Sequence, residues 1–201
     1  SEGKLRQSIS RESYERLLKH ASTEPDFAYI GSIGNGEARG ALCGFTARSL
    51  TTLHLPATYS GSGDALDSDE LAGKMESLIA RYHIEDAGGP LSLPGGWIGC
   101  LSYELGYARE ARLSQKLPVS PCPLIHAGFY LWTASHNRKT GDYSLWIHPD
   151  CPTDTHDALN IWLAEPAGTR LERWQMSSNF VPRQSEAGFK ASVDRIRNYI
   201  E

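Results

Sequence analysis

The strongest constraint on the fold is a turn between two runs rich in aromatic and branched residues. The runs span residues 125–134 and 142–148, and the sequence HNRKTG between them ends on Gly141. Aromatic and β-branched residues favour strands, and a short polar link that contains glycine is typical of a hairpin. The segment therefore predicts two antiparallel strands and favours a sheet built from hairpins.

Further strands are predicted where short apolar runs stand between turn-forming residues. They cover residues 27–30, 41–47, 50–55 and 97–103, and we expect the second and third of these to form a hairpin. Gly99 interrupts the last run, which indicates that another backbone approaches this strand closely on one side. Because hairpins rather than strand–helix–strand units connect the runs, the sequence predicts an α+β fold, a mainly antiparallel sheet flanked by helices.

Four segments carry apolar residues at helical spacing. They are residues 11–20 after the N-cap Ser10, 70–83 after Asp69, 153–164 capped by Thr153 or Asp154, and 184–201. The side chains expected to face inward in the first three are Tyr14, Leu17 and Leu18, then Leu71, Met75, Leu78, Ile79 and Tyr82, then Ala158, Ile161 and Trp162. The last segment carries one apolar stripe, formed by Phe189, Val193, Ile196 and Ile200. We expect this stripe to dock on a partner surface, because four large apolar side chains favour burial.

The composition argues against several classes of protein. The 201 residues carry a net charge of −4 with scattered lysine and arginine, so no nucleic-acid partner is expected. No run approaches the about 18 apolar residues of a membrane span, and the first residues lack the apolar core of a secretory signal. Four cysteines without a CxxC pair are too few for a disulfide scaffold. We therefore expect a cytoplasmic protein without a membrane partner, unless a leader has been removed.

Two patterns resemble binding sites only superficially. Cys122, His126, His148 and Cys151 could meet on adjacent hairpin strands, but their spacing is not that of a zinc finger, so we expect no structural zinc. The sequence GNGEARG at 34–40 lacks the Gly-Lys-Ser/Thr ending of a phosphate loop. A strand pattern rather than a helix follows it, so we expect no phosphate site there, although the loop could hold a small ligand.

No catalytic set is evident in the sequence. Cys100 and Ser102 stand in GCLSYELG, which is not a GxSxG elbow and places no base nearby, so core packing is the expected role of both. Glu104 and Glu110 are six residues apart, and this spacing alone defines no acid–base pair. The aromatic residues Trp97, Tyr103, Phe129, Tyr130, Trp132 and Trp146 are expected in the core rather than on a stacking surface. The residues alone thus indicate a globular α+β domain with no catalytic residues of its own.

Two segments carry a resemblance to a known family. The sequence PGGWIGCLSYELGYARE at 94–110 resembles the segment of chorismate-aminating component I enzymes in which a Gly-Gly pair leads into a strand with a Gly-x-x-x-Tyr-Asp/Glu ending. The matching residues are Gly95, Gly96, Gly99, Tyr103 and Glu104. Residues 174–201 are similar to the strand, linker and helix that open the catalytic region of that family, and the hairpin lies in the corresponding order. The resemblance extends from about residue 26 to 201, but Ser135 stands where relatives often have Asp, and the loop near residue 32 is shorter.

The resemblance implies a division of labour along the chain. Residues 1–173 would be the N-terminal non-catalytic region of component I, and residues 174–201 the truncated start of the chorismate-binding catalytic region. The full-length parent would aminate chorismate with Mg²⁺ and with ammonia from a glutamine-amidotransferase partner. Its catalytic residues and metal-binding glutamates would lie beyond this segment, which alone would bind no cofactor and be inactive. The early Gly-Gly pair favours aminodeoxychorismate synthase, of para-aminobenzoate and folate synthesis, over anthranilate synthase, of tryptophan synthesis.

The resemblance also implies a ligand pocket. Several members of the family bind tryptophan beside a serine after the first strand and an arginine before the next, and Ser32 and Arg39 match those positions. Arginine can hold a carboxylate through two hydrogen bonds, and a serine hydroxyl can accept from an ammonium group. Gly40 stands where relatives can carry a bulkier side chain. The alternative is that Arg39 is a surface residue and Ser32 a loop residue.

A function from another class remains open. The chain could be a stand-alone domain that binds a small molecule or a protein. The apolar stripe of residues 189–200 separates the two hypotheses: an exposed stripe favours a part of a larger enzyme, and a packed, capped helix favours a complete module.

Overall fold

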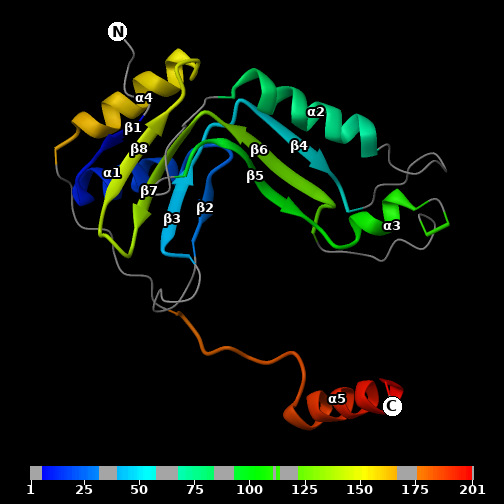
Figure 1. The fold of residues 1–201 in the computed structure, drawn as a ribbon. Helices are drawn as coiled ribbons and strands as arrows, with labels where there is room; N and C mark the ends of the chain where they lie inside the picture. The colour runs from blue at the N-terminus through cyan, green and yellow to red at the C-terminus, as the bar shows by residue number, and fades with distance from the viewer. Residues whose placement is uncertain are drawn as a thin grey trace. The chain divides into compact units, whose positions relative to one another are not determined.

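Two antiparallel sheets form the framework of the protein (Figure 1). The computed structural model describes residues 6–31, 40–57, 68–83, 93–110, 112–113, 122–166 and 176–200. Sheet A has the order β1 (Arg6–Ser8), β8 (Tyr143–Ile147), β7 (Trp132–Asn137), β3 (Leu42–Thr46) and β2 (Ala28–Ile30). Sheet B has the order β4 (Thr51–Leu55), β6 (Ile125–Tyr130) and β5 (Gly96–Leu101). The predicted α+β class is confirmed.

The hairpin expected from the HNRKTG turn is confirmed in β7 and β8, which pair antiparallel. Gly141 adopts φ +79°, a conformation that glycine adopts without the strain of a side chain. The side-chain oxygen of Asn137 accepts hydrogen bonds from the backbone N–H groups of Lys139, at 3.0 Å, and Thr140, at 3.3 Å. The turn is thus specified by its own residues, which explains why the sequence predicts it.

The prediction that residues 41–47 and 50–55 form a hairpin is wrong, because β3 and β4 belong to different sheets. β3 pairs with β7 in sheet A, whereas β4 pairs with β6 in sheet B. Likewise, residues 125–134 do not form one strand, because the run breaks at Leu131 and its two halves, β6 and β7, also divide between the sheets. Two long antiparallel runs, β3–β4 and β6–β7, therefore pass together from one sheet into the other.

The bend in the two runs has an extra residue on one side. Five residues lie between Phe45 and Thr51, whereas four lie between their register partners Ala134 and Phe129. Such an extra residue has the effect of a β-bulge, which bends and twists the pair. Arg48 lies in this longer segment and adopts φ +54°, a conformation that is unfavourable for a residue with a side chain.

Local contacts stabilise the strained residue. The backbone N–H of Arg48 donates to the Pro25 carbonyl at 2.8 Å. Its guanidinium Nε donates to Glu24 Oε2 at 2.6 Å in a partly buried ion pair, and the same guanidinium lies 5.4 Å from the centre of a Trp162 ring. Since Trp162 belongs to a helix packed on sheet A, these contacts tie the bend to the core.

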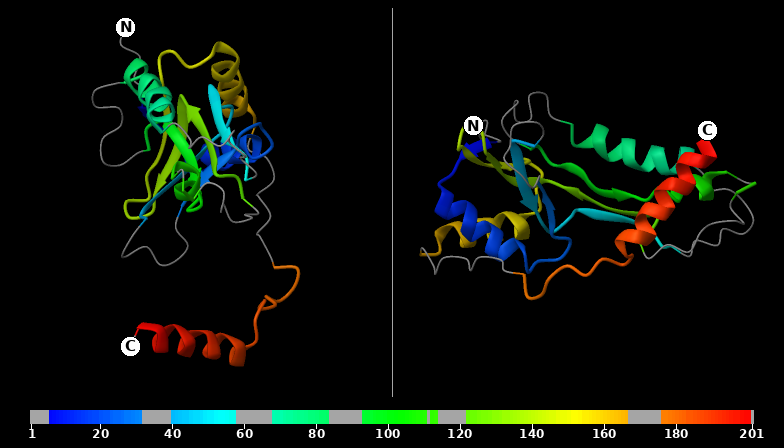
Figure 2. Two further views of the ribbon diagram at one scale, coloured as in Figure 1. Left: turned by 90° about the vertical axis from the view of Figure 1, so that its right-hand side faces the viewer. Right: turned by 90° about the horizontal axis from the view of Figure 1, so that it is seen from below.

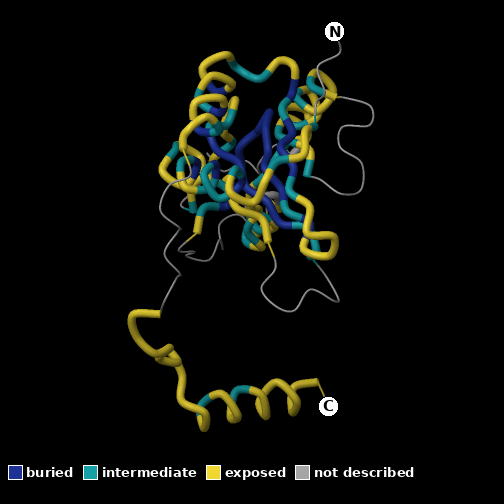
Figure 3. The backbone as a smooth tube through the Cα atoms, turned by 90° about the vertical axis from the view of Figure 1, so that its left-hand side faces the viewer, coloured by how far each residue is buried: buried dark blue, intermediate teal, exposed yellow. Residues whose placement is uncertain are grey.

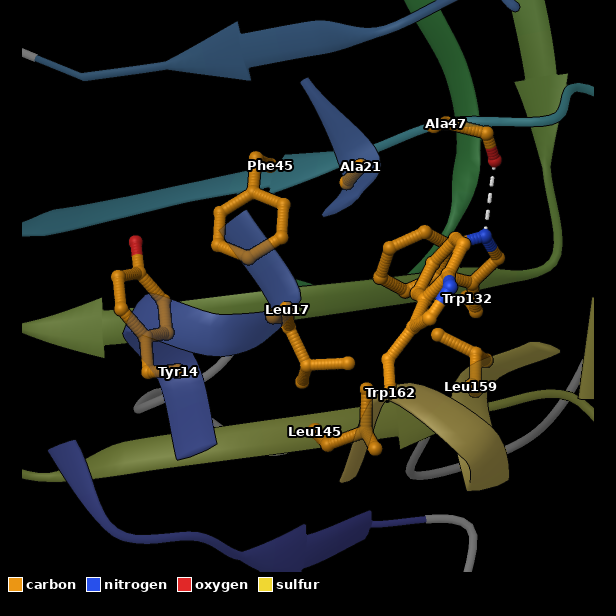
Figure 4. Packing of buried hydrophobic residues seen from close by; sticks show 10 residues of the cluster. Tyr14, Leu17, Ala21, Phe45, Ala47, Trp132, Leu145, Leu159 and Trp162 are labelled. Atoms are coloured by element: carbon orange, nitrogen blue, oxygen red, sulfur yellow. Dashed lines mark hydrogen bonds between the residues drawn. The ribbon is translucent and has the colours of Figure 1, made fainter. Parts of the chain in front are cut away.

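The core lies between sheet A and two helices, α1 (Arg11–Ala21) and α4 (Thr153–Ala164), which pack beside each other (Figure 2). Leu17, Phe45, Trp132, Leu145 and Leu159 meet there with 2% or less of their surface exposed (Figure 4). The Trp132 indole N–H donates to the Ala47 carbonyl at 2.8 Å, so its polar atom is satisfied inside the core. Burial of such side chains contributes about 1.5–3 kcal/mol each.

The helix predictions hold in part. Ser10 caps α1 by accepting from the Ser13 N–H at 3.1 Å, and Tyr14 and Leu17 are buried as expected. The α4 cap is wrong: Pro152 occupies that position without a side-chain hydrogen bond, and Asp154 accepts from the neighbouring Thr155 N–H instead. Ile161 is 62% exposed because contact with α1 and sheet A turns a different face inward. That buried face consists of Thr155, Leu159 and Trp162.

Helix α2 (Ser68–Arg81) lies along sheet B (Figures 1 and 2). The Trp97 indole N–H donates to the Met75 carbonyl at 3.1 Å, and the rings of Tyr82 and Phe129 lie 5.7 Å apart. Asp69 lies in the first turn of α2 rather than at its cap. Ile79, expected to face inward, is 50% exposed. A shorter helix, α3 (Leu105–Arg109), follows β5.

The chain divides into two compact units, Ser1–Thr169 and Arg170–Glu201. The second contains α5 (Glu186–Ile200), which confirms the predicted terminal helix. The stripe side chains are exposed to different degrees, from 38% for Val193 to 78% for Ile200. Figure 3 shows most of the α5 backbone in the colour of exposed residues. Docking of this stripe on a partner stays a prediction. No helix in the described part of the chain is both long and apolar enough to cross a membrane.

Candidate functional site: an aromatic cavity at the junction of the sheets

A cavity of about 430 Å³ lies where sheet B meets sheet A. α2 and the two residues that follow it contribute one wall, the start of β5 another, and the end of β6 and β8 the rest. The side chains that form these walls are Ile79, Tyr82, His83, Pro94, Trp97, Phe129, Tyr130, Leu131 and Trp146. Gly95 and Gly96 complete the described lining. The volume falls in the range of small-molecule sites.

Gly95 and Gly96 of the lining, and Gly99 of β5, are each constrained by contacts or by backbone conformation. A Cβ on Gly95 would overlap the Tyr130 carbonyl oxygen and the Trp146 ring, and a Cβ on Gly99 would overlap Ala127 and the His126 carbonyl. Gly96 adopts φ +120°, which a residue with a side chain rarely adopts. The close backbone approach expected at Gly99 is therefore confirmed, and the same constraint applies at Gly95.

The cavity is polar at a few points only. Trp146 is 3% exposed. Its indole N–H is buried and has no hydrogen-bond partner among the described residues. The Tyr130 hydroxyl donates to the Asp26 carbonyl at 2.7 Å. Burial, with a smaller contribution from the Asp26 carboxylate, raises the pKa of Tyr130 to about 12. The tyrosine thus stays neutral at physiological pH, and the buried indole N–H presents no accessible donor to the cavity.

A buried histidine stands behind the cavity. His148 contacts the rings of Tyr82 and Trp146, with ring centres at 5.4 and 6.0 Å. Its Nδ1 accepts from the Asp150 N–H at 2.9 Å, so the neutral ring carries its hydrogen on Nε2. Burial lowers the pKa of His148, and Asp150 and the Tyr82 carbonyl offset part of that effect.

The described lining is mainly aromatic and apolar. It contains no carboxylate, lysine, arginine, serine or cysteine among its described residues. A nucleophile with an adjacent base is therefore not formed here. Aromatic walls favour a planar apolar group.

The remaining family-motif residues lie away from the cavity. Tyr103, expected in the core, is 89% exposed, in the turn between β5 and α3. The Ser102 hydroxyl donates to Glu104 at 2.8 Å, and this hydrogen bond lowers the pKa of Glu104. Cys100 is exposed rather than packed in the core. By contrast, Phe129, Tyr130, Trp132 and Trp146 are buried, as the sequence predicts.

The tryptophan-type pocket is not tested by the structure. Ser32 and Arg39 lie outside the described residues, as does most of the 34–40 loop. Gly40 is described and adopts φ +88° shortly before β3. The expectation that a strand rather than a helix follows the loop is confirmed by β3.

The structure does not bring Cys122, His126, His148 and Cys151 together as a metal site. Within the described ranges, no three histidine, cysteine, aspartate or glutamate side chains group as metal ligands. His126 instead faces His54 across sheet B, with 3.2 Å between their Nδ1 atoms. The sequence did not single out His54, because its partner depends on the pairing of β4 with β6. The absence of structural zinc stays a prediction.

No model of a known protein family matches the chain. A search of curated protein sequences also finds no match.

Proposed function

We propose that this chain is the N-terminal, non-catalytic region of an aminodeoxychorismate synthase component I. Its full-length parent is a cytoplasmic enzyme that aminates chorismate for para-aminobenzoate and folate synthesis. The parent uses Mg²⁺ and receives ammonia from a glutamine-amidotransferase partner. The segment itself carries no catalytic residue, and tryptophan is a possible ligand at Ser32, Arg39 and Gly40.

The observation that carries this proposal is the role of the motif glycines. Gly95 and Gly99 are required by contact with neighbouring strands, and Gly96 by its backbone conformation. A motif whose glycines each meet a steric demand is a fold determinant, which is how the family segment is expected to behave. The β7–β8 hairpin and then α5 follow this segment, in the order on which the resemblance rests. The strand that the resemblance implies before the last helix is not formed within the described residues 176–185.

The first test measures the chain as it stands. Incubated with chorismate, Mg²⁺ and an ammonium salt, it should form neither aminodeoxychorismate nor anthranilate above a no-protein control. The physical reason is that the described cavity lining holds no carboxylate, lysine, arginine, serine or cysteine. Turnover by the chain alone would contradict the proposal.

The second test uses the native reading frame. The proposal expects it to continue past Glu201 into a catalytic region, and the full-length product to form aminodeoxychorismate. In that enzyme Gly95→Val should abolish activity, since the added side chain has no space. The matched control Gly106→Ala, where a Cβ meets nothing within 4 Å, should retain it. A frame without a catalytic region would overturn the proposal, and anthranilate as product would move the protein to the other branch.

A second candidate function is a stand-alone small-molecule-binding domain, which the aromatic cavity favours. Benzoate is a suitable probe because it carries a planar ring. Titrated with benzoate, the indole N–H signals of Trp97 and Trp146 should shift in NMR spectra. The Trp132 signal, from an indole bonded inside the core, should stay fixed as an internal control. Unchanged Trp97 and Trp146 signals would exclude binding of this probe in the cavity.

A further inference from the structure

A row of three metal-ligating side chains crosses sheet B. His126 of the central strand β6 is the register partner of His54 on β4 and of Cys100 on β5. Residues directly opposite each other in antiparallel strands project from the same face of a sheet. Side chains alternate between faces along a strand, so Phe129 and its partner Trp97, which contact α2, lie on the other face. The row therefore occupies the face that α2 does not cover.

The two imidazoles are spaced as ligands of one ion. Their Nδ1 atoms lie 3.2 Å apart, and the rings are nearly perpendicular, at 81°. Two nitrogens bound to Zn²⁺ at their usual distance and at a near-tetrahedral angle are about 3.3 Å apart. Without a metal, the same spacing suits a hydrogen bond in which one ring donates to the other. A metal ion would take the place of that proton, with each ring turned so that its nitrogen lone pair points at the ion.

The row is accessible to an ion and to water. His54, His126 and Cys100 are all exposed, so entry needs no opening of the fold. Since no three ligands in the described ranges already enclose a site, Cys100 has to rotate toward the imidazoles to become the third ligand. Imidazole and thiolate select zinc-like ions over Mg²⁺ and Ca²⁺, which prefer oxygen.

We propose that His54 and His126 form a surface site for a divalent transition-metal ion of the Zn²⁺ type. The Cys100 thiolate and water complete its coordination. The site shares only His126 with the Cys122, His126, His148 and Cys151 set of the sequence analysis. It lies on an exposed face and exchanges its metal with solvent, so the fold does not depend on it. This proposal does not depend on the function proposed above.

Titration calorimetry tests the proposal. Chelator-treated, thiol-reduced protein should bind one equivalent of Zn²⁺ and no Mg²⁺. His54→Ala and His126→Ala should each weaken binding by at least about tenfold, since loss even of a supporting residue has effects of that order. Cys100→Ser should weaken binding less than either. His156→Ala, which removes an exposed histidine on α4, is the matched control and should bind like the parent chain. Unchanged affinity in His54→Ala would overturn the proposal.

A second measurement needs no substitution and remains informative if a variant fails to fold. Paramagnetic Ni²⁺ added in small amounts should broaden amide NMR signals around His54 and His126 first. Signals of α1 and α4, which pack on sheet A, should broaden last. Broadening centred on His20, His83 or His156 instead would also overturn the proposal.

Discussion

Sheets A and B are built from the same two long runs of chain, yet they differ in how thoroughly they are covered. In sheet A, β7 has four consecutive buried residues, from Trp132 to Ser135. Trp132 and Ala134 pack in the core with the helices, whereas Thr133 and Ser135 lie on the opposite face of the strand, beside Leu93. In sheet B, the edge strand β5 ends in three exposed residues, and β4 is mostly exposed. Only the central strand β6 is buried along most of its length.

This difference shows that burial follows position in the fold rather than the hydrophobicity of a segment. The β5 sequence GWIGCL is apolar, but Leu101 at its end is 60% exposed. The β7 sequence WTASHN contains several polar residues, but Thr133 and Ser135 are 1% exposed. Buried hydroxyls of this kind need partners, and Ser135 has one in the Ser144 hydroxyl at 3.0 Å.

A pair of tryptophans measures the difference most directly. Trp132 in sheet A and Trp97 in sheet B both donate an indole N–H to a backbone carbonyl, but only Trp132 is fully buried. We expect Trp132→Ala to lower the free energy of unfolding by about 4 kcal/mol, because it leaves a large cavity. Trp97→Ala should cost about 1–2 kcal/mol, since its burial is partial. Urea denaturation measures both, and equal losses would contradict the comparison.

A glycine substitution tests how closely the strands of sheet B approach. Gly99→Ala should lower the free energy of unfolding by about 2 kcal/mol, because the new Cβ overlaps Ala127 and the strands must shift. Gly106→Ala in α3 is the control, since its Cβ meets open space and alanine favours a helix. Thermal unfolding compares the two variants. If Gly99→Ala is as stable as the control, β5 lies farther from β6 than the structure places it.

The smallest expected effect concerns pH. Burial lowers the pKa of His148, which is 5% exposed, and burial with Arg138 and Arg11 lowers that of His136. Below about pH 6.5, the unfolded chain protonates these rings while the folded chain still resists. The stability that the two neutral rings contribute is complete above about pH 6.5 and is lost as the pH falls through their lowered folded-state pKa values.

Replacement of His148 by Asn keeps a hydrogen-bond acceptor for the Asp150 N–H but removes the titrating ring. We expect the free energy of unfolding of His148→Asn to change less between pH 7.5 and 5.5 than that of the parent chain. His156→Asn, at an exposed position, should keep the parent slope. The opposite ranking of the two variants would show that burial at the junction of the sheets is less complete than in sheet A.

The local elements of this protein are determined by the sequence itself. Helix α1 follows from its Ser10 cap and apolar spacing, and the β7–β8 turn follows from Asn137 and Gly141. These features depend on residues a few positions apart, so the information is contained in one short stretch of chain. The α+β class follows from them, because hairpin turns specify antiparallel neighbours.

Only the tertiary structure decides which strands from distant segments pair and where the runs bend. Arg48 shows no sequence signal of its positive φ, because its conformation depends on Glu24, Pro25 and Trp162. The aromatic cavity needs α2 and both sheets in place, and His54 meets His126 across 72 positions of sequence. A strand pattern specifies which face of a strand is apolar but not its neighbour, since many pairings satisfy the same alternation. The energy that selects one of them comes from the packing of the whole core.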